Sequence, residues 1–157
     1  MKALVVYGTY SGGTQIAAEI IAHVLEEQKI DVVVQDVHKT KPADFASYSH
    51  VIFGSNSWFE EREEGNMNSG YHVLKKSMSP TTLVDKICFV YGLGDANMYT
   101  STFTKSVEHL AQFIKEAGGV QSLDSLRVNR FYFERSANEQ IIADWAHQVA
   151  GVITESK

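Results

Sequence analysis

Short apolar runs alternate with longer periodic segments along most of the chain. Runs of strand length cover residues 3–7, 30–34, 51–54, 87–91 and 126–128, and the last can extend as far as residue 133. A continuous apolar run is typical of a strand that is buried on both faces. Between these runs, apolar residues recur at helical spacing in residues 14–28, 71–78, 103–118 and 141–152.

The alternation predicts an α/β fold with a doubly wound, five-stranded parallel sheet and helices on both of its faces. No repeat, low-complexity tract or linker interrupts the pattern. We therefore expect a single domain over residues 1–157.

Composition narrows the classes of function. The 157 residues carry a net charge of −5, whereas a nucleic-acid-binding protein normally presents a basic patch. No segment approaches the ~20 apolar residues of a membrane span, and the first residues do not resemble a signal peptide. We expect a cytoplasmic protein that binds neither nucleic acid nor membrane. Cys88 lies in an apolar run, so it is expected to be a buried, unreactive side chain.

Three chemically unusual loops follow the expected strands, at residues 8–14, 55–65 and 92–102. The carboxyl ends of parallel strands meet at one edge of the sheet, and ligands of doubly wound folds bind beyond that edge. A ligand site is therefore expected where these loops converge.

The first loop favours a phosphate group. It places hydroxyl and glycine residues directly before a helix, where free backbone N–H groups and the helix dipole attract anions; these residues are Thr9, Tyr10, Ser11, Gly12, Gly13 and Thr14. Neither a Gly-Lys-Ser/Thr nor a Gly-x-Gly-x-x-Gly motif is present, and no Lys or Arg lies between Lys2 and Lys29. Neutral donors suit a phosphate monoester better than a polyphosphate. The alternative is a plain glycine turn with a capping threonine.

The other two loops each carry an aromatic residue. Trp58 has polar neighbours, unlike Trp145, which lies on the apolar face of the last expected helix and is assigned to the core. Tyr99 follows the glycine-rich stretch that begins at Gly92. Two aromatics at adjacent strand ends favour a slot for a flat ring, and each stacked pair contributes about 0.5–1.5 kcal/mol beyond area burial.

Taken together, these motifs resemble the flavodoxin family over nearly the whole chain, in its short-chain branch. The resemblance implies the strand order 2-1-3-4-5 and non-covalently bound FMN. It implies that residues 9–14 hold the phosphate, that Trp58 and Tyr99 flank the isoalloxazine, and that the Gly94–Asp95 backbone meets its pyrimidine edge. The remaining cofactor-binding residues expected from it are Ser55, Asn56, Ser57, Phe59, Leu93 and Phe103.

The function that the resemblance implies is a low-potential one-electron carrier without a substrate of its own. Its expected partners are redox proteins, such as an NADP-flavodoxin reductase as donor and a low-potential enzyme as acceptor, and we expect a monomer. Two alternatives stay open: an FMN-dependent quinone or NAD(P)H reductase, and a flavin-free binding module of the same fold. No histidine pair has metal-ligand spacing, so no metal site is expected.

Two positions depart from the family pattern. Gly13 stands where the family usually has asparagine, which removes one donor to the phosphate. Phe59 stands where it usually has glycine or asparagine, at a peptide that turns over on reduction. A non-glycine residue there costs roughly 1–2 kcal/mol, which predicts roughly 45–90 mV less stabilisation of the semiquinone.

The segment Arg130-Phe131-Tyr132-Phe133 is open to two interpretations. Three consecutive aromatics cannot all face one side of a strand. The segment is expected either to extend the last strand beneath the helices or to form a docking patch for a redox partner.

Overall fold

The computed structural model describes residues 1–156, so Lys157, which the expected domain includes, lies outside the described residues. Most strands and helices lie within a few residues of the expected ranges. In chain order the elements are β1 (Lys2–Gly8), α1 (Gly13–Glu27), β2 (Asp31–Asp36), the 3-10 helices Val37–Lys39 and Pro42–Ser47, β3 (His50–Asn56), β4 (Trp58–Glu60), β5 (Glu63–Asn66), α2 (Ser69–Ser77), β6 (Ile87–Gly94), α3 (Ser106–Glu116), β7 (Val120–Gln121), β8 (Leu126–Asn129) and α4 (Arg135–Glu155).

The main sheet has the order β2-β1-β3-β6-β7, and β8 also pairs with β6. All of these pairings are parallel. Because β7 and β8 together take the fifth position, the doubly wound parallel sheet and its order 2-1-3-4-5 are confirmed. The reason lies in the sequence: β1, β3 and β6 are apolar and almost wholly buried, as strands covered on both faces must be.

The fifth position of the sheet is filled by two short strands. β7 pairs with β6 at Ile87 and Cys88, and β8 pairs with it from Tyr91 to Gly94. The Ser122 N–H still donates to the Cys88 carbonyl. Residues 123–125 interrupt the pairing, and Leu123 adopts a left-handed backbone there (φ 63°). The expected extension of the last strand to residue 133 is wrong, since β8 ends at Asn129 and residues 130–133 form a turn.

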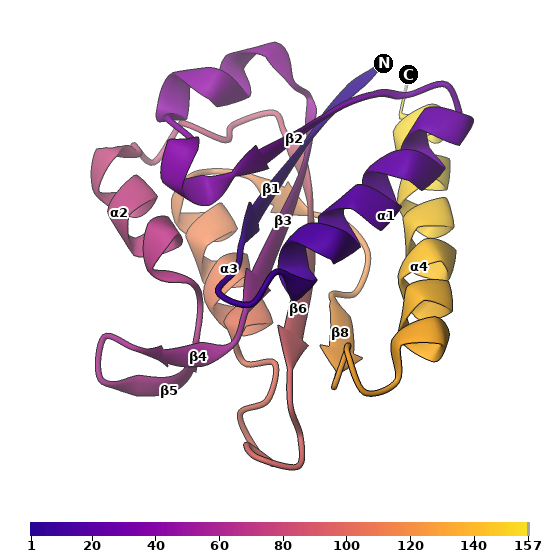
Figure 1. Ribbon diagram of the computed structural model, residues 1–157. Coiled ribbons are helices and arrows are strands. Elements are labelled where there is room, and N and C mark those ends of the chain that lie inside the picture. Colours follow the sequence, from indigo (N-terminus) through magenta and orange to yellow (C-terminus); the bar gives the residue numbers. More distant parts are fainter. Residues whose placement is uncertain (157) are drawn as a thin grey trace.

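Helices cover both faces of the sheet: α1 and α4 lie on one side, α2 and α3 on the other (Figure 1). Each face has its own apolar core. Trp145 is 6% exposed in the core beneath α1 and α4, as the sequence predicts. Cys88 is fully buried in the opposite core, and burial raises the pKa of its thiol to about 12. Cys88 is therefore structural.

The loop after β3 is more ordered than the sequence suggests, because it contains the β4–β5 hairpin. Trp58 pairs with Asn66 and Glu60 with Glu63, so that Glu61 and Arg62 form a two-residue turn. Both turn residues have positive φ (49° and 63°), which the tightest antiparallel hairpins require. Neither is a glycine or asparagine, so no turn signal marks this hairpin in the sequence.

Two loops project beyond the carboxyl edge of the sheet: the β4–β5 hairpin and the loop between β6 and α3 (Figure 1). The first turn of α1 and the turn before α4 lie at the same end, opposite the two termini. None of the helices in residues 1–156 is both long and apolar enough to span a bilayer.

Candidate functional site

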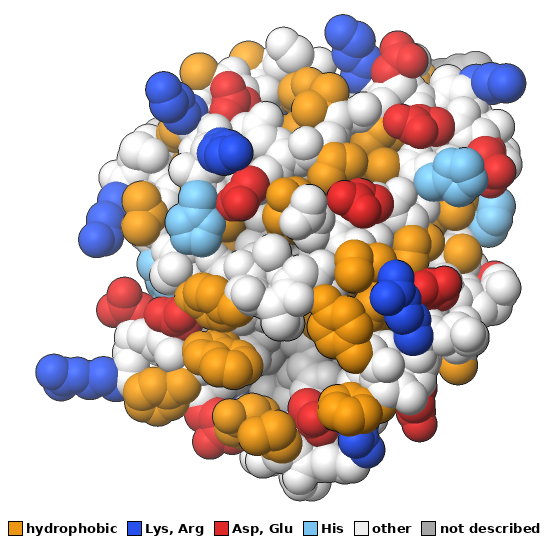
Figure 2. Space-filling view, viewed as in Figure 1, with side chains coloured by type: hydrophobic (Ala, Val, Ile, Leu, Met, Phe, Trp, Pro, Cys, Tyr) orange, Lys and Arg blue, Asp and Glu red, His pale blue; other side chains and the backbone are white. Residues whose placement is uncertain are grey.

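A cavity of about 470 Å³ opens among these loops at the carboxyl edge of the sheet. Hydrophobic side chains gather around a hollow at the lower end of the molecule (Figure 2). The expected site residues that border the cavity are Tyr10, Ser11, Gly13, Thr14, Asn56, Ser57, Trp58, Leu93, Gly94, Asp95 and Tyr99. The structure thus brings residues of all three expected loops to one place.

Five of the expected residues do not border the cavity. Thr9 and Gly12 lie in the first loop, next in sequence to residues that line the cavity, and are hydrogen-bonded to each other. Ser55 is fully buried behind the second loop. Phe59 is 63% exposed on β4. The Phe103 backbone packs against Gly94, since a Cβ at Gly94 would overlap the Phe103 carbonyl. Phe103 therefore contacts the third loop and does not line the cavity.

The first loop leads into α1 as an anion site requires. The helix begins at Gly13, and no side chain caps its N-terminus. Gly12 has a left-handed backbone (φ 91°) that favours glycine. Thr9 Oγ1 accepts a hydrogen bond from the Gly12 N–H at 2.9 Å, which leaves the Thr9 hydroxyl proton free to donate. The loop therefore offers hydroxyl and helix N–H donors, all of them neutral.

The sheet holds the start of α1 through a buried tyrosine. The Tyr91 hydroxyl donates to the Thr14 carbonyl at 2.9 Å. Gly54 on β3 makes room for this side chain, because a Cβ at Gly54 would overlap the Tyr91 ring. Burial places the pKa of Tyr91 well above its ordinary value, so its hydroxyl remains protonated and remains a donor.

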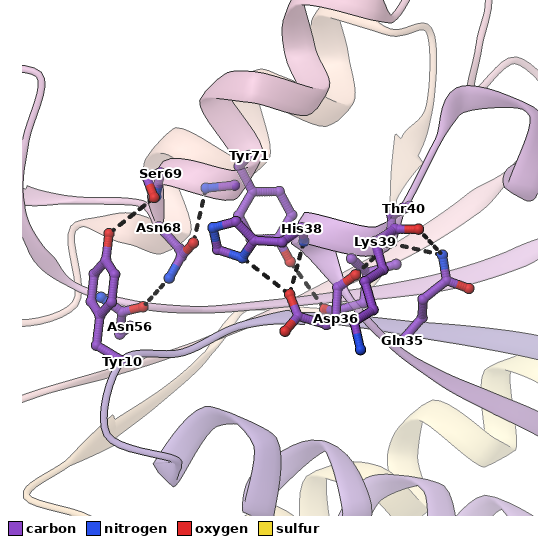
Figure 3. A network of polar contacts seen from close by, with 12 residues as sticks. Tyr10, Gln35, Asp36, His38, Lys39, Thr40, Asn56, Asn68, Ser69 and Tyr71 are labelled. Atoms are coloured by element: carbon purple, nitrogen blue, oxygen red, sulfur yellow. Dashed lines mark hydrogen bonds and ion pairs between the residues drawn. The ribbon is translucent and has the colours of Figure 1, made fainter.

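Aromatic contacts join the first loop to the β4–β5 hairpin. The Tyr10 ring lies 6.0 Å from the Trp58 ring, at an interplanar angle of 59°. The Tyr10 hydroxyl donates to Glu60. It also lies 3.2 Å from the Ser69 hydroxyl at the start of α2 (Figure 3). Burial and the Glu60 hydrogen bond raise the pKa of Tyr10. Trp58 borders the cavity and is 53% exposed, so part of its ring is accessible from the cavity and from solvent.

Asn56 supplies a polar group with no partner. Asn68 Oδ1 accepts the Gly70 N–H, so its amide nitrogen faces Asn56 and donates to Oδ1 of Asn56 at 3.0 Å (Figure 3). That bond consumes the acceptor of Asn56. Its amide nitrogen is buried without a hydrogen-bond partner, although the residue borders the cavity.

The turn before α4 also borders the cavity, through residues 130–133, as does Met98, although none of these residues is among the expected cofactor-binding residues. Phe131 is buried, whereas Tyr132 and Phe133 are 47% and 73% exposed. The interpretation as an extended strand is wrong, because β8 ends at Asn129, and the interpretation as a docking patch stays a prediction. The position of this segment in the sequence could have indicated a site role, because the residues after a fifth parallel strand start from the same edge of the sheet as the other three loops.

Arg130 brings a cation to the cavity, whereas the donors expected for the phosphate are all neutral. Its guanidinium lies 4.5 Å from the Phe133 ring centroid, and its Nε is 3.9 Å from Asp95 Oδ1. The Nε atom is nevertheless buried without a hydrogen-bond partner. Sequence proximity could not reveal this, because Arg130 is far along the chain from the phosphate loop.

The residues present fit FMN. Within the described residues, the buried side-chain nitrogen or oxygen atoms that lack a partner belong to Asn56 and Arg130. Both are donors and both residues border the same cavity, so an acceptor-rich ligand would satisfy them. Aromatic and apolar side chains suit a flat ring, and the start of α1 suits a phosphate. Residues 1–156 contain no cluster of three or more His, Cys, Asp or Glu side chains that could hold a metal ion.

Comparisons with known proteins agree with this geometry. The flavodoxin family model matches residues 5–141. A flavodoxin of Maridesulfovibrio salexigens is 33% identical over 129 residues, which are 82% of this chain and 86% of that protein.

Solved structures share the fold. A short-chain flavodoxin associated with a non-canonical PDU bacterial microcompartment superposes with a TM-score of 0.79 at 22% identity and covers 99% of both chains. The Fusobacterium nucleatum flavodoxin bound to flavin mononucleotide has a TM-score of 0.76 at 13% identity, over 94% of this chain and 96% of its own. At such identities the structures support the fold alone. The family model and the relative that is 33% identical show the family, and the chain belongs to the flavodoxins.

Proposed function

We propose that the protein binds FMN non-covalently in this cavity and carries single electrons at low potential between other redox proteins. The observation that carries the proposal is the pair of buried, unpartnered donors, Asn56 Nδ2 and Arg130 Nε, in one cavity beside an uncapped helix start. Family membership supports the electron-carrier role.

The residues divide by the part of FMN that they would hold. The phosphate would be held by Ser11, Thr14 and the N–H groups at the start of α1, which are neutral donors near a positive helix end. Trp58 and Tyr99 would contact the flavin ring. When bound, FMN supplies the electron transfer itself, which no amino-acid side chain of this site can perform.

The chain's own contribution is binding, orientation and control of charge. The aromatic and apolar lining, which includes Leu93 and Phe131, excludes water from the ring. Asn56 is oriented by Asn68 and is ready to donate. Asp95 in the third loop and Arg130 in the turn before α4 place opposite charges at the cavity, and such charges would tune the reduction potential of a bound flavin.

Exposed apolar side chains at the rim of the cavity support docking of partner proteins. Trp58, Met98 and Phe133 border the cavity and are 53%, 70% and 73% exposed, and Phe59 is exposed beside Trp58 on β4. Electron transfer needs close approach to the cofactor, and transient redox complexes use small interfaces. The proposed partners are an NADP-flavodoxin reductase as donor and a low-potential enzyme as acceptor, each meeting a monomer at this rim.

An absorption spectrum of the purified protein, followed by titration of the apoprotein with FMN, tests cofactor binding. We expect one FMN per chain and two resolved one-electron steps on stepwise reduction. A protein that takes up no FMN would overturn the proposal and favour a flavin-free module. A protein that oxidises NAD(P)H directly, without a reductase, would instead favour the FMN-dependent reductase.

A further inference from the structure

A tyrosine far along the chain is hydrogen-bonded to the phosphate loop, residues 9–14. The Tyr132 hydroxyl donates to the carbonyl of Ser11 at 2.6 Å, across 121 residues of sequence. Tyr132 belongs to the turn before α4 and borders the same cavity as Ser11. The contact therefore joins the last part of the chain to the first loop.

Both ends of the Ser11–Gly12 peptide are held. Tyr132 binds its carbonyl, and Thr9 Oγ1 binds its N–H at 2.9 Å. This peptide directly precedes the first N–H groups of α1, so its orientation decides how the loop enters the helix. Gly12 takes a left-handed backbone at this point (φ 91°), and glycine pays the largest entropic cost for being fixed. The two hydrogen bonds to the Ser11–Gly12 peptide therefore offset part of the entropic cost of fixing Gly12.

The same ring occupies the space beside both glycines. A Cβ at Gly12 would lie 3.3 Å from the Tyr132 hydroxyl oxygen. A Cβ at Gly13 would lie 3.1 Å from Leu93 Cδ2 and 3.5 Å from Tyr132 Cε2. The contact with Leu93 is tight, whereas the contact with Tyr132 is at ordinary van der Waals distance. The Tyr132 ring therefore restricts only the atoms that a side chain at position 13 would carry beyond its Cβ.

The turn that carries Tyr132 is itself well anchored. The Arg130 N–H donates to the Gly94 carbonyl at 2.8 Å, and the Tyr132 ring packs edge-on against Phe131 with centroids 5.3 Å apart. Asn138 Nδ2 on α4 donates to the Asn129 carbonyl at 2.9 Å. Tyr132 can therefore transmit the rigidity of the third loop and of α4 to the phosphate loop.

We propose that Tyr132 is a positioning residue that holds the phosphate loop in its anion-binding conformation, and that its ring, together with Leu93, restricts the side chain that position 13 can carry. The inference rests on the proposed function, because the anion is taken to be the phosphate of FMN. It adds a role for the aromatic turn and gives a structural reason for the absence of a side chain at position 13.

Titration of the apoprotein with FMN and with riboflavin tests the positioning role, because riboflavin lacks the phosphate. Tyr132→Phe removes only the hydroxyl, and Tyr48→Phe serves as a matched control that removes a hydroxyl away from the cavity. We expect Tyr132→Phe to weaken FMN binding about five- to tenfold, the size expected for one hydrogen bond, with riboflavin binding within about twofold of the wild type. Tyr48→Phe should change neither.

The outcomes separate this inference from the proposed function. Equal loss of FMN and riboflavin affinity in Tyr132→Phe would indicate a merely structural tyrosine and overturn the positioning role. Unchanged FMN affinity would overturn it as well. A wild-type protein that binds neither ligand would instead remove the proposed function.

A double-mutant cycle tests the match between Gly13 and Tyr132. Gly13→Asn should weaken FMN binding by at least about tenfold in the wild-type background, because the new side chain competes with Tyr132 and Leu93 for space. In the Tyr132→Ala background the same substitution should cost at least about threefold less, while the contact with Leu93 remains in both backgrounds. Equal costs in the two backgrounds would show that the two positions are independent and would overturn the pairing.

Discussion

The side-chain amide of Asn68 donates to Oδ1 of Asn56 at 3.0 Å, and the amide nitrogen of Asn56 is left buried without a partner. Asn68 cannot reverse its own amide, because its Oδ1 accepts the Gly70 N–H at 2.9 Å as the N-cap of α2. A helix cap thus dictates which atom Asn56 keeps free at the cavity.

This relationship predicts the behaviour of Asn56→Asp. The substitution keeps an oxygen for Asn68 but replaces the free donor with a second oxygen, which carries negative charge at neutral pH. We expect FMN affinity to fall by more than about tenfold, because a donor is lost and a repulsive charge is added. Asn68→Ser is the control, since serine also caps helices well and should cost less. Measured dissociation constants in the reverse order would contradict this role.

Phe59→Gly tests the effect of a side chain after Trp58. Phe59 lies on β4, and its φ is not positive, unlike that of Glu61, Arg62 and Gly65 further along the hairpin. If the peptide turns over on reduction, glycine should raise the first one-electron potential by about 45–90 mV relative to the phenylalanine protein. Phe59→Ala keeps the Cβ and should leave the potential unchanged. Redox titration of the wild type, Phe59→Gly and Phe59→Ala measures this potential. Identical potentials would show that the side chain at position 59 does not affect semiquinone stability.

Arg130→Gln tests the cation at the cavity. Reduction adds negative charge to a bound flavin, and one positive charge ~10 Å away stabilises that charge by about 0.4–1.7 kcal/mol. The second reduction potential should therefore fall by about 20–70 mV, less whatever Asp95 already offsets at 3.9 Å. Arg127→Gln is the control, because Arg127 binds Thr104 and does not border the cavity. A matching drop in both variants would point to a general charge effect.

Gly94 and Gly151 form a pair for measuring stability. A Cβ at Gly94 would overlap the Phe103 carbonyl, whereas a Cβ at Gly151 meets nothing within 4 Å. Gly94→Ala should lower the free energy of unfolding by about 1–3 kcal/mol through overpacking. Gly151→Ala lies inside α4 and should raise it by about 0.5–1 kcal/mol. Urea unfolding measures both, and a destabilised Gly151→Ala would contradict the open space at that position.

Histidine titration predicts a loss of stability under mild acid. Burial lowers the pKa of His50, with help from the positive N-terminus, and burial lowers the pKa of His72. The unfolded chain therefore binds more protons than the folded one below about pH 6.5. The free energy of unfolding should fall as the pH drops from above 6.5 through the lowered folded-state pKa values. His50→Gln should flatten the pH dependence; an unchanged slope would show that His50 does not contribute.

Much of the architecture was predictable from the sequence because local patterns record it. The apolar runs of β1, β3 and β6 mark strands covered on both faces, and a glycine-rich loop before an apolar-periodic segment marks the start of α1. Parallel strands end at one edge, so the convergence of the first three loops followed from topology alone. The β4–β5 hairpin did not, because its turn residues Glu61 and Arg62 carry no turn signal.

The sequence by itself determined the sheet, its helices and three of the segments that surround the cavity. The reason is that buried strands and helices are regular, so they require apolar residues at regular spacing along the chain. Only the tertiary structure decided what each side chain meets. It placed Tyr132 on the Ser11 carbonyl, set Arg130 beside Asp95, and left Asn56 with a free donor. These contacts join residues far apart in sequence through irregular turns, and no local periodicity encodes the distance between two loops.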